Sequence, residues 1–170
     1  PNPAETVVGR VKIAENTSPI PQDRIFFNYS LFDNVPLFPG GVTVNRYSPG
    51  FEKTALDGGA SFEMRFPFAS TLDSSYVING PLDSGSVEFG NLYMVGKYLV
   101  ARSDRAALST GLVLTVPTAS DLRVFFSDGQ PLVHIKNQSV HLMPFIGWLY
   151  HTGRFFAQGF FDVDLDTNGN

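Results

Sequence analysis

The sequence predicts an all-β protein: an antiparallel up-and-down β-barrel of the transmembrane type, or part of one, with about seven to eight strands. Apolar and polar residues alternate in about seven aromatic-rich segments, as they do in half-buried strands. The connections between these segments are alternately long and very short, a rhythm typical of outer-membrane barrels. Of the residues, 14% are aromatic and only 16% are charged, well below the roughly 25% of charged residues in soluble domains.

The chain divides into a lead-in and one domain. Residues 1–23 contain four prolines and no sustained periodicity, which predicts an extended lead-in. Residues 24–170 are the expected antiparallel barrel domain, and their number suits a single domain.

Three strands are expected in the first half of the chain, at residues 24–33, 42–51 and 60–69. The second contains Pro49, which cannot donate a ladder hydrogen bond and so belongs near a strand end. The third alternates almost without exception. It places Phe62, Met64, Phe66 and Phe68 on one face and Ser61, Glu63, Arg65 and Pro67 on the other.

Four strands are expected in the second half, at residues 87–102, 106–117, 139–150 and 154–165. Residues 118–137 form a long connection that fits either a structured loop or a hairpin of its own. Pro144 argues against a strand paired on both sides unless a bulge or a strand start lies near Phe145.

Seven strands is an odd number, whereas bacterial single-chain barrels have an even number. The last residues, DTNGN, favour a turn into a following strand. We therefore expect the domain to be incomplete at its C-terminus, or its barrel to be closed by another copy in a homo-oligomer or a larger envelope assembly.

Three long segments carry a family resemblance: GRVKIAENTSPIPQDRIFFNY, VNRYSPGFEKTALDGGASFEMRFPFASTLDSS, and HLMPFIGWLY with RFFAQGFFDVDLDTNGN. In these the chain resembles a family of uncharacterised planctomycete exported proteins with outer-membrane barrels. More distantly, GLVLTVPT followed by a PFIG-type strand is similar to the MetA-type phenol-degradation outer-membrane channels. The resemblance implies an outer-membrane location and a barrel longer than this chain, and it supplies no catalytic residues.

Composition excludes several classes of function. A net charge of −4 without a Lys/Arg cluster argues against nucleic acid as a partner. The absence of cysteine excludes disulfides and thiolate chemistry. No apolar run is long enough for a spanning helix, and no leader pattern opens the chain. We expect an exported protein in its mature form, located in the outer membrane with the lipid bilayer as its partner.

The expected function is that of a non-enzymatic pore or structural envelope component. Polar residues on the face opposite the apolar one would line its lumen. The candidate lumen-lining residues are Asn28, Glu63, Arg65, Asn91, Lys97, Gln158 and Asp162.

Two other classes fit the same strand pattern. In a soluble β-sandwich or jelly roll, the polar face would be solvated, and the long loops at 69–86 and 118–137 would bind carbohydrate or a protein partner. In a lipocalin-like cup, the phenylalanines would face inward. The exposure of Phe62, Met64, Phe66 and Phe68 discriminates among these possibilities.

Asp164, Asp166 and Asn168 fit the first half of a calcium loop, in which alternate oxygen ligands precede a glycine. The same residues fit a β-turn rich in Asp and Asn, which we prefer because a strand rather than a helix leads into them. No other cofactor is expected.

His134, His141 and His151 could suggest hydrolysis together with Ser139 or Asp128. Ser139 lacks the G-x-S-x-G context of a nucleophile elbow, and the histidine spacings match no metal motif. We therefore interpret the three histidines as turn or interface residues and predict no enzyme.

Overall fold

The structure is a computed structural model that describes residues 16–35, 42–70, 75–77 and 87–167. Within these ranges, no helix is long and apolar enough to cross a lipid bilayer. The chain forms strands and one short 3-10 turn, Leu56–Gly58. The strands are β1 (Arg24–Val35), β2 (Val42–Ala55), β3 (Ala60–Arg65), β4 (Phe68–Ser70), β5 (Ser75–Val77), β6 (Val87–Phe89), β7 (Leu92–Arg102), β8 (Ala106–Val116), β9 (Leu122–Phe125), β10 (Pro131–Ile135), β11 (His141–Thr152), β12 (Phe155–Asp162) and β13 (Leu165–Asp166).

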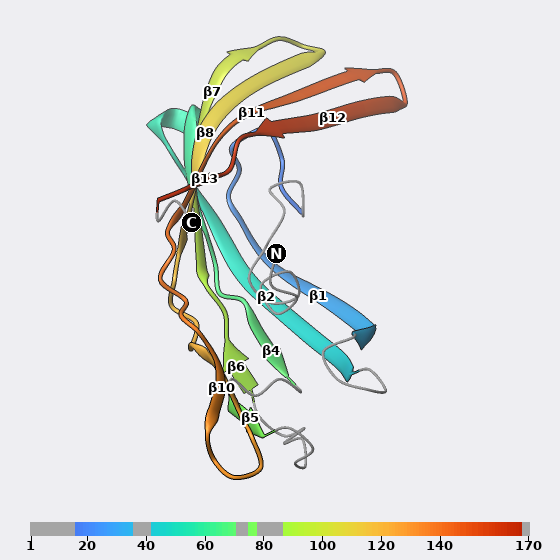
Figure 1. Cartoon of the computed structure of the whole chain (residues 1–170). Helices are drawn as coiled ribbons and strands as arrows, with labels where there is room; N and C mark the ends of the chain where they lie inside the picture. The colour runs from blue at the N-terminus through green and yellow to red at the C-terminus, as the bar shows by residue number, and fades with distance from the viewer. Residues whose placement is uncertain (1–15, 36–41, 71–74, 78–86, 168–170) are drawn as a thin grey trace.

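Most of these strands form one antiparallel sheet that curls into a half-barrel (Figure 1). Across the sheet the order is β12, β11, β8, β7, β3, β2 and β1. The short strand β4 continues the line of β3 and pairs with β2, and β6 continues the line of β7 and pairs with β4. If β3 with β4, β6 with β7, and β12 with β13 are each counted as one strand, the described residues of this sheet form seven long strands. The predicted all-β, barrel-like fold is confirmed, and β1 and β12 are the two edges of the curl.

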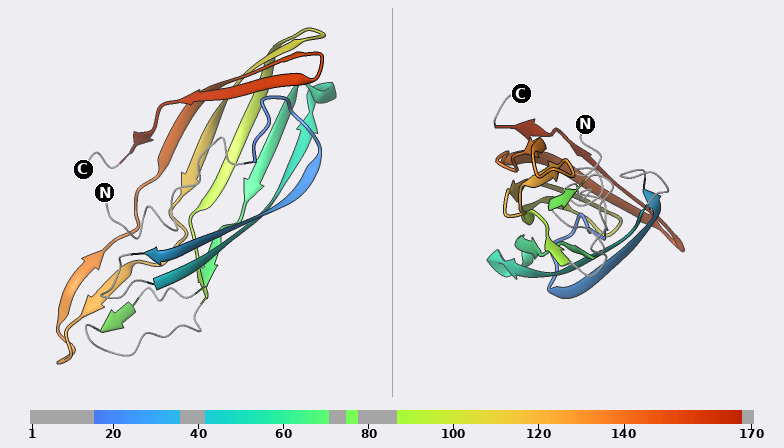
Figure 2. Two further views of the ribbon diagram at one scale, coloured as in Figure 1. Left: turned by 90° about the vertical axis from the view of Figure 1, so that its right-hand side faces the viewer. Right: turned by 60° about the horizontal axis from the view of Figure 1, so that its bottom comes forward.

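The connections alternate in length, as the sequence predicts. Residues 56–59, 103–105 and 153–154 turn the chain tightly at one end of the strands. At the other end lie β5, β9 and β10, which form a separate three-stranded sheet (Figure 2). The 118–137 connection therefore contains a hairpin of its own, one of its two expected forms.

Pro49 lies inside β2, Pro144 lies inside β11, and Pro67 lies in the gap between β3 and β4. Each of these prolines faces an interruption in the neighbouring strand. The carbonyl oxygen of Pro49 accepts from Phe66 N, that of Pro67 from Gly90 N, and that of Pro144 from Val163 N, at 2.9, 2.7 and 3.2 Å. Because the N and C=O of one strand residue point to the same side, each proline nitrogen also faces such an interruption. We call this row of broken pairings the proline seam.

The proline seam corrects two boundary predictions. Strand β2 does not end near Pro49 but continues to Ala55, because Pro49 lies where the partner changes from β4 to β3. Strand β11 does not start near Phe145 but at His141, and its pairing with β8 has no bulge at Pro144. Proline is tolerated in both strands because no donor is required of it there.

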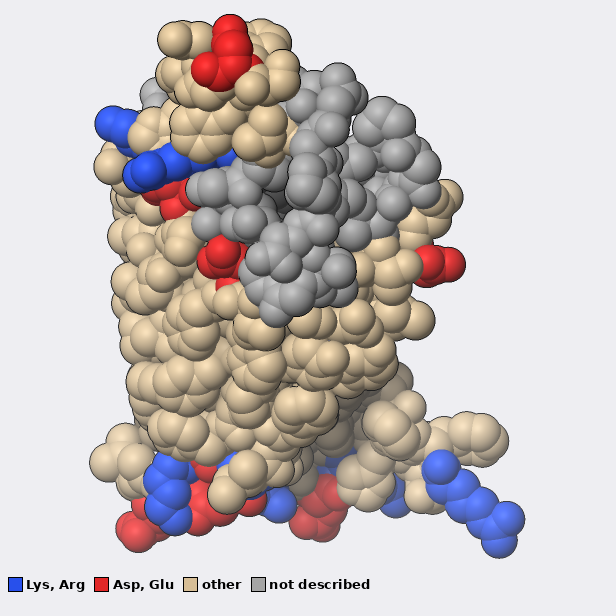
Figure 3. All heavy atoms as spheres, turned by 90° about the horizontal axis from the view of Figure 1, so that it is seen from below, with Lys and Arg blue, Asp and Glu red and all other residues tan. Residues whose placement is uncertain are grey.

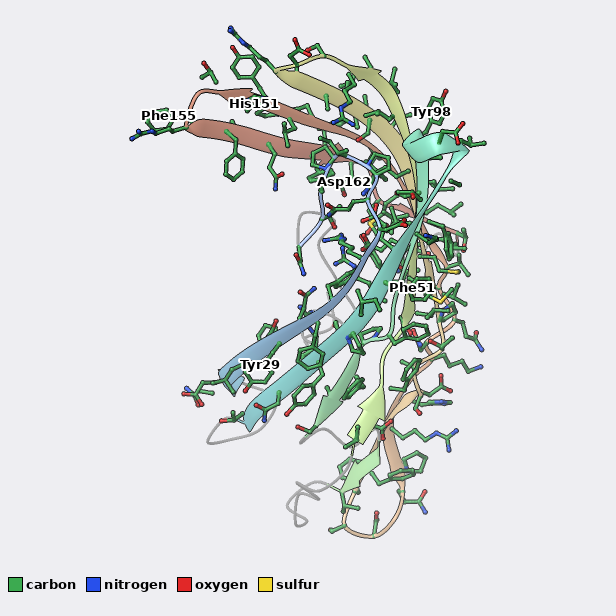
Figure 4. All side chains as sticks on the ribbon, turned by 180° about the vertical axis from the view of Figure 1, so that it is seen from behind. Tyr29, Phe51, Tyr98, His151, Phe155 and Asp162 are labelled. Carbon is green, nitrogen blue, oxygen red and sulfur yellow. The ribbon has the colours of Figure 1, made fainter. Side chains whose placement is uncertain are left out.

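The burial of side chains is inverted relative to a soluble sandwich. On β3, Phe62 is 43% exposed and Met64 is half-buried, whereas Glu63 and Arg65 are 1% and 0% exposed. In Figure 4, Phe51 and Tyr98 lie on the convex side of the curl. Among the described residues, no second sheet packs against the convex face. The apolar face therefore points outward and the charged face inward.

A small apolar core lies beside the charges on the concave face. Tyr93, Val95, Val113 and Phe145 are buried there, and Met143 and Phe160 pack against them. Gly111 is required at this place, because a Cβ on it would lie 2.1 Å from the Gly96 carbonyl oxygen and 2.6 Å from the Phe145 ring.

Candidate functional site

Five charged side chains meet on the concave face, and we call them the charge cluster. Arg24 comes from β1, Glu52 from β2, Glu63 and Arg65 from β3, and Lys97 from β7. The side chains of the last four are at most 1% exposed, and that of Arg24 is 16% exposed. Ionised groups this deeply buried require partners.

The partners are the members of the cluster themselves. Glu52 accepts from Lys97 Nζ and Arg24 Nε, both at 2.8 Å. Glu63 accepts from Arg24 Nη2 at 2.8 Å and from Arg65 Nε at 2.5 Å. Arg24 therefore bridges the two carboxylates and ties the edge strand β1 to β2 and β3.

The strand period of two explains why these residues meet. Glu52 pairs with Glu63 across β2 and β3, and Arg24 pairs with Glu52 across β1 and β2. Ser61, which faces the same way as Glu63, pairs with Lys97 and donates to Glu52 at 2.6 Å. Residues in register on adjacent strands bring their side chains within contact distance on one face.

The end of the lead-in covers the charge cluster. Thr17, Pro19 and Pro21 are buried, although the sequence predicts only an extended lead-in here. Arg65 Nη2 donates to Thr17 Oγ1, and Arg24 Nη1 donates to the Asn16 carbonyl oxygen at 2.5 Å. Residues 16–22 therefore fold into the concave face, held by the two arginines, and residues 1–15 lie outside the described ranges.

The structure brings together three of the seven candidate lumen residues: Glu63, Arg65 and Lys97. Asn28 faces the same side and accepts from Asn16 Nδ2 at 2.8 Å. Asn91 accepts instead from Asn137 and from the Ala119 amide at 2.6 and 3.1 Å, and so anchors the 118–137 connection.

Gln158 and Asp162 belong to the edge strand β12, away from the charge cluster. They pair with Leu149 and Phe145, whose side chains face inward, so both point toward the concave side, as Figure 4 shows for Asp162. Both are exposed.

Sequence reasoning missed Arg24 and Glu52 as members of the site. The prediction ended the second strand near Pro49 and so left Glu52 out of the alternation of inward and outward side chains. The alternation in fact continues through the proline, and the buried residues on the concave face are Arg46, Ser48, Gly50 and Glu52. Arg24 shares its face with Asn28 by the same period. Extending the alternation through the proline would have found Glu52.

The residues of the calcium hypothesis have protein partners. Asp164 Oδ1 lies 3.0 Å from His141 Nδ1, and Asp166 accepts from Ser139 Oγ. Asp166 belongs to β13, which pairs with β11, and Asn168 lies outside the described residues. Over the part of the chain that the structure describes, no three His, Asp or Glu side chains form a group that could hold a metal ion. The calcium site stays a prediction without support from this geometry.

The three histidines lie apart, each with its own partner. His134 contacts Asp121 at 3.1 Å, His141 contacts Asp164, and His151 Nε2 lies 2.6 Å from the Asp104 carbonyl oxygen. Ser139 bonds Asp166 rather than a histidine. These contacts do not form a Ser-His-Asp arrangement.

The convex face is apolar over most of its height. Figure 3 shows a broad zone without Lys, Arg, Asp or Glu, with charged side chains gathered beyond its two borders. The exposed apolar side chains that point outward from the long strands are Ile25, Phe27, Tyr29, Leu31, Phe51, Phe62, Tyr98, Leu108, Leu112, Ile146, Trp148, Tyr150, Phe155 and Phe161.

No family model, curated protein or solved structure matches the chain. The resemblance to planctomycete exported proteins and to MetA-type channels therefore stays a prediction.

Proposed function

We propose that the protein is a non-enzymatic β-barrel of an outer membrane, acting as a pore or a structural component of the envelope. The observation that carries the proposal is the inverted burial: ion-paired charges lie on the concave face and large apolar side chains cover the convex face. In water an apolar band of this extent would be costly, whereas in a bilayer it is the favourable surface.

The arrangement of aromatic side chains supports the same proposal. Trp148, Tyr150 and Tyr98 point outward near the tight-turn end and are 44%, 47% and 54% exposed. Tyr29 and Tyr47 contact each other nearer the other end, with tilted rings whose centroids are 5.4 Å apart. Amphipathic rings gain from lying at the headgroup level on both sides of a bilayer.

The charge cluster and residues 16–22 bear on the choice between a pore and a structural role. They fill the concave face at the level of Glu52 and Glu63, where the charged side chains are buried and pair with one another. A barrel of about eight strands is filled by its own side chains. The proposal therefore favours a narrow or closed lumen over a wide channel.

Fractionation of cells that produce the native protein tests the proposal. We expect association with membranes that resists carbonate, together with a mobility shift between boiled and unboiled samples on a denaturing gel. Release into the soluble fraction without a shift would contradict it.

One observation favours the second candidate, a soluble module that binds through its long loops. Residues of both long connections meet in one sheet, because β5 pairs in parallel with β9. Release into the soluble fraction would make this small sheet the first place to search for a carbohydrate or protein ligand.

A further inference from the structure

Two neighbouring tight turns carry arginines without partners. Arg105 belongs to the β7–β8 turn and Arg154 to the β11–β12 turn, and both side chains are exposed. In the described ranges, neither guanidinium group has an ion pair or a hydrogen-bond partner. By contrast, Lys53, at the same end of β2, pairs with Asp23. Two free cations at the border of the apolar band attract anions to this part of the surface.

The two turns lie next to each other because β8 and β11 are neighbours in the sheet. The His151 amide donates to the Arg105 carbonyl oxygen at 2.8 Å. Asp104 is the one acidic residue of the two turns. Arg102 ends β7 nearby, but it pairs with the buried Ala107 and so points to the concave side. The outward border of these turns therefore has a net positive charge.

Below the turns, the outward face of β11 carries two amphipathic rings with small neighbours. Tyr150 pairs with Ala106 on β8 and with Ala157 on β12, so no large side chain flanks its ring in this row. Trp148 extends over β12, where a Cβ on Gly159 would lie 2.8 Å from the indole Nε1. No described residue is a hydrogen-bond partner of the Tyr150 hydroxyl or of the Trp148 Nε1. Both groups are therefore free to donate to a molecule from outside.

The distance between the rings and the turns matches the thickness of a headgroup layer. Strand β11 ends at Thr152, two residues or about 7 Å beyond Tyr150. The headgroup layer is about 5–7 Å thick on each side of the hydrocarbon. When the Tyr150 ring lies at the border of the hydrocarbon, Arg105 and Arg154 therefore lie at the depth of the lipid phosphates.

We propose that Arg105, Arg154, Trp148 and Tyr150 bind an anionic phospholipid, one whose net charge is that of its phosphate, in preference to a zwitterionic one. The inference rests on the proposed function, because the apolar band must lie in a bilayer. The guanidinium groups pair with the phosphate, and the indole and phenol groups donate to headgroup oxygens. A zwitterionic lipid offers the same phosphate, but its ammonium group lies close to the arginines and offsets the attraction.

The single tryptophan, Trp148, reports which lipid lies beside the site. The full chain is refolded into phosphatidylcholine vesicles that contain an equal small fraction of either brominated phosphatidylglycerol or brominated phosphatidylcholine, since bromine quenches tryptophan fluorescence on contact. We expect stronger quenching by the brominated phosphatidylglycerol, with a relative affinity of about fivefold. One basic side chain near an anionic surface contributes about this factor, and Asp104 offsets the second arginine.

The double variant Arg105→Gln/Arg154→Gln should be quenched equally by the two lipids. Lys53→Gln is the matched control, because it removes an exposed cation at the same end but on β2, which β3, β7 and β8 separate from β11. It should keep the preference. Equal quenching of the wild type by both lipids, or a preference that survives in the double variant, would overturn this inference and leave the membrane proposal standing. If neither lipid quenched Trp148, the ring would not face a bilayer, and both proposals would fail.

Discussion

At the scale of single residues, neighbours in sequence occupy opposite environments. Glu63 is buried among ion pairs, and the adjacent Met64 lies on the convex face. Such an alternation is the reverse of a soluble sheet, in which the charged residue would face water. If the surroundings of the convex face are taken to be apolar, the polarity of a residue therefore predicts whether it lies on the concave or the convex face.

Met64→Arg should reduce the free energy of unfolding in bilayers by about 2–4 kcal/mol, because it places a charge in the middle of the apolar band. Gln158→Arg is the control, since Gln158 is exposed and points to the concave side, and it should cost much less. Urea unfolding of the two variants refolded into lipid vesicles measures the difference. Equal costs would contradict the assignment of the faces.

Lys97→Met should destabilise the protein by less than the about 3–5 kcal/mol usual for a buried pair that loses one partner. The cost is reduced because Arg24 still pairs with Glu52. The double variant Lys97→Met/Glu52→Gln should lose less than the sum of the two single variants, with a coupling of about 0.5–3 kcal/mol. Additive losses in denaturant titrations would show that the pair does not act as a unit.

At the scale of elements, the period of two predicts all seven long strands and the tight turns between them. It fails where the chain has no period, at residues 16–22, whose burial depends on Arg24 and Arg65 from other elements. At Pro49 the period holds, and the rule that places proline near a strand end fails instead, since it cannot show that the neighbouring strand is interrupted at the same level. The composition of the site thus depends on register between strands, which no single segment reveals.

Two glycines on neighbouring strands should respond with opposite signs. Gly111→Ala should destabilise by about 1–3 kcal/mol through overpacking, because its Cβ would meet the Gly96 carbonyl oxygen and Phe145. Gly96→Ala should stabilise by about 0.5–1 kcal/mol, since nothing lies within 4 Å of its Cβ. If the unfolding midpoints of both variants shifted in the same direction, this would contradict the packing described around the two glycines.

The β9–β10 hairpin should loosen in acid. The Asn137 amide and His134 hold the pKa of Asp121 below its usual range. The ionised Asp121 carboxylate therefore stabilises the folded hairpin fully above the unfolded pKa of about 3.9. This stabilisation is lost as the pH falls through the lower pKa of the folded state. Hydrogen exchange at Asn137, corrected for intrinsic rates, should show less protection at pH 3 than at pH 5. Asp121→Asn should abolish this difference.

At the scale of the whole molecule, the two ends of the barrel differ. The tight turns lie at one end and the β9–β10 hairpin at the other (Figure 2). Outer-membrane barrels have short periplasmic turns and longer outer loops. The proposed function therefore places β9 and β10 outside the cell.

Single cysteines test this orientation, because these 170 residues contain none. Ser127→Cys, in the β9–β10 turn, should react with a membrane-impermeant maleimide on intact cells. Ser103→Cys, in the β7–β8 turn, should react only after permeabilisation. The reverse pattern would invert the orientation, and equal labelling of both on intact cells would contradict the membrane location.

The two edges constrain how the barrel closes. Seven antiparallel strands leave β1 and β12 running in the same direction. Two copies related by rotation about the barrel axis would therefore join through parallel seams. A fully antiparallel closure needs an odd number of further strands between β12 and β1.

The charge cluster also has a consequence for assembly. Its members span residues 24 to 97 and come from four strands. The β1–β2 hairpin contains the neutral pair of Arg24 and Glu52, but the β2–β3 hairpin alone would carry Glu52 without Arg24 or Lys97. In hydrocarbon such an unpaired charge costs several kcal/mol. On the proposed function, we therefore expect β1, β2, β3 and β7 to pair before they cross the bilayer, so that this half of the barrel inserts in one concerted step.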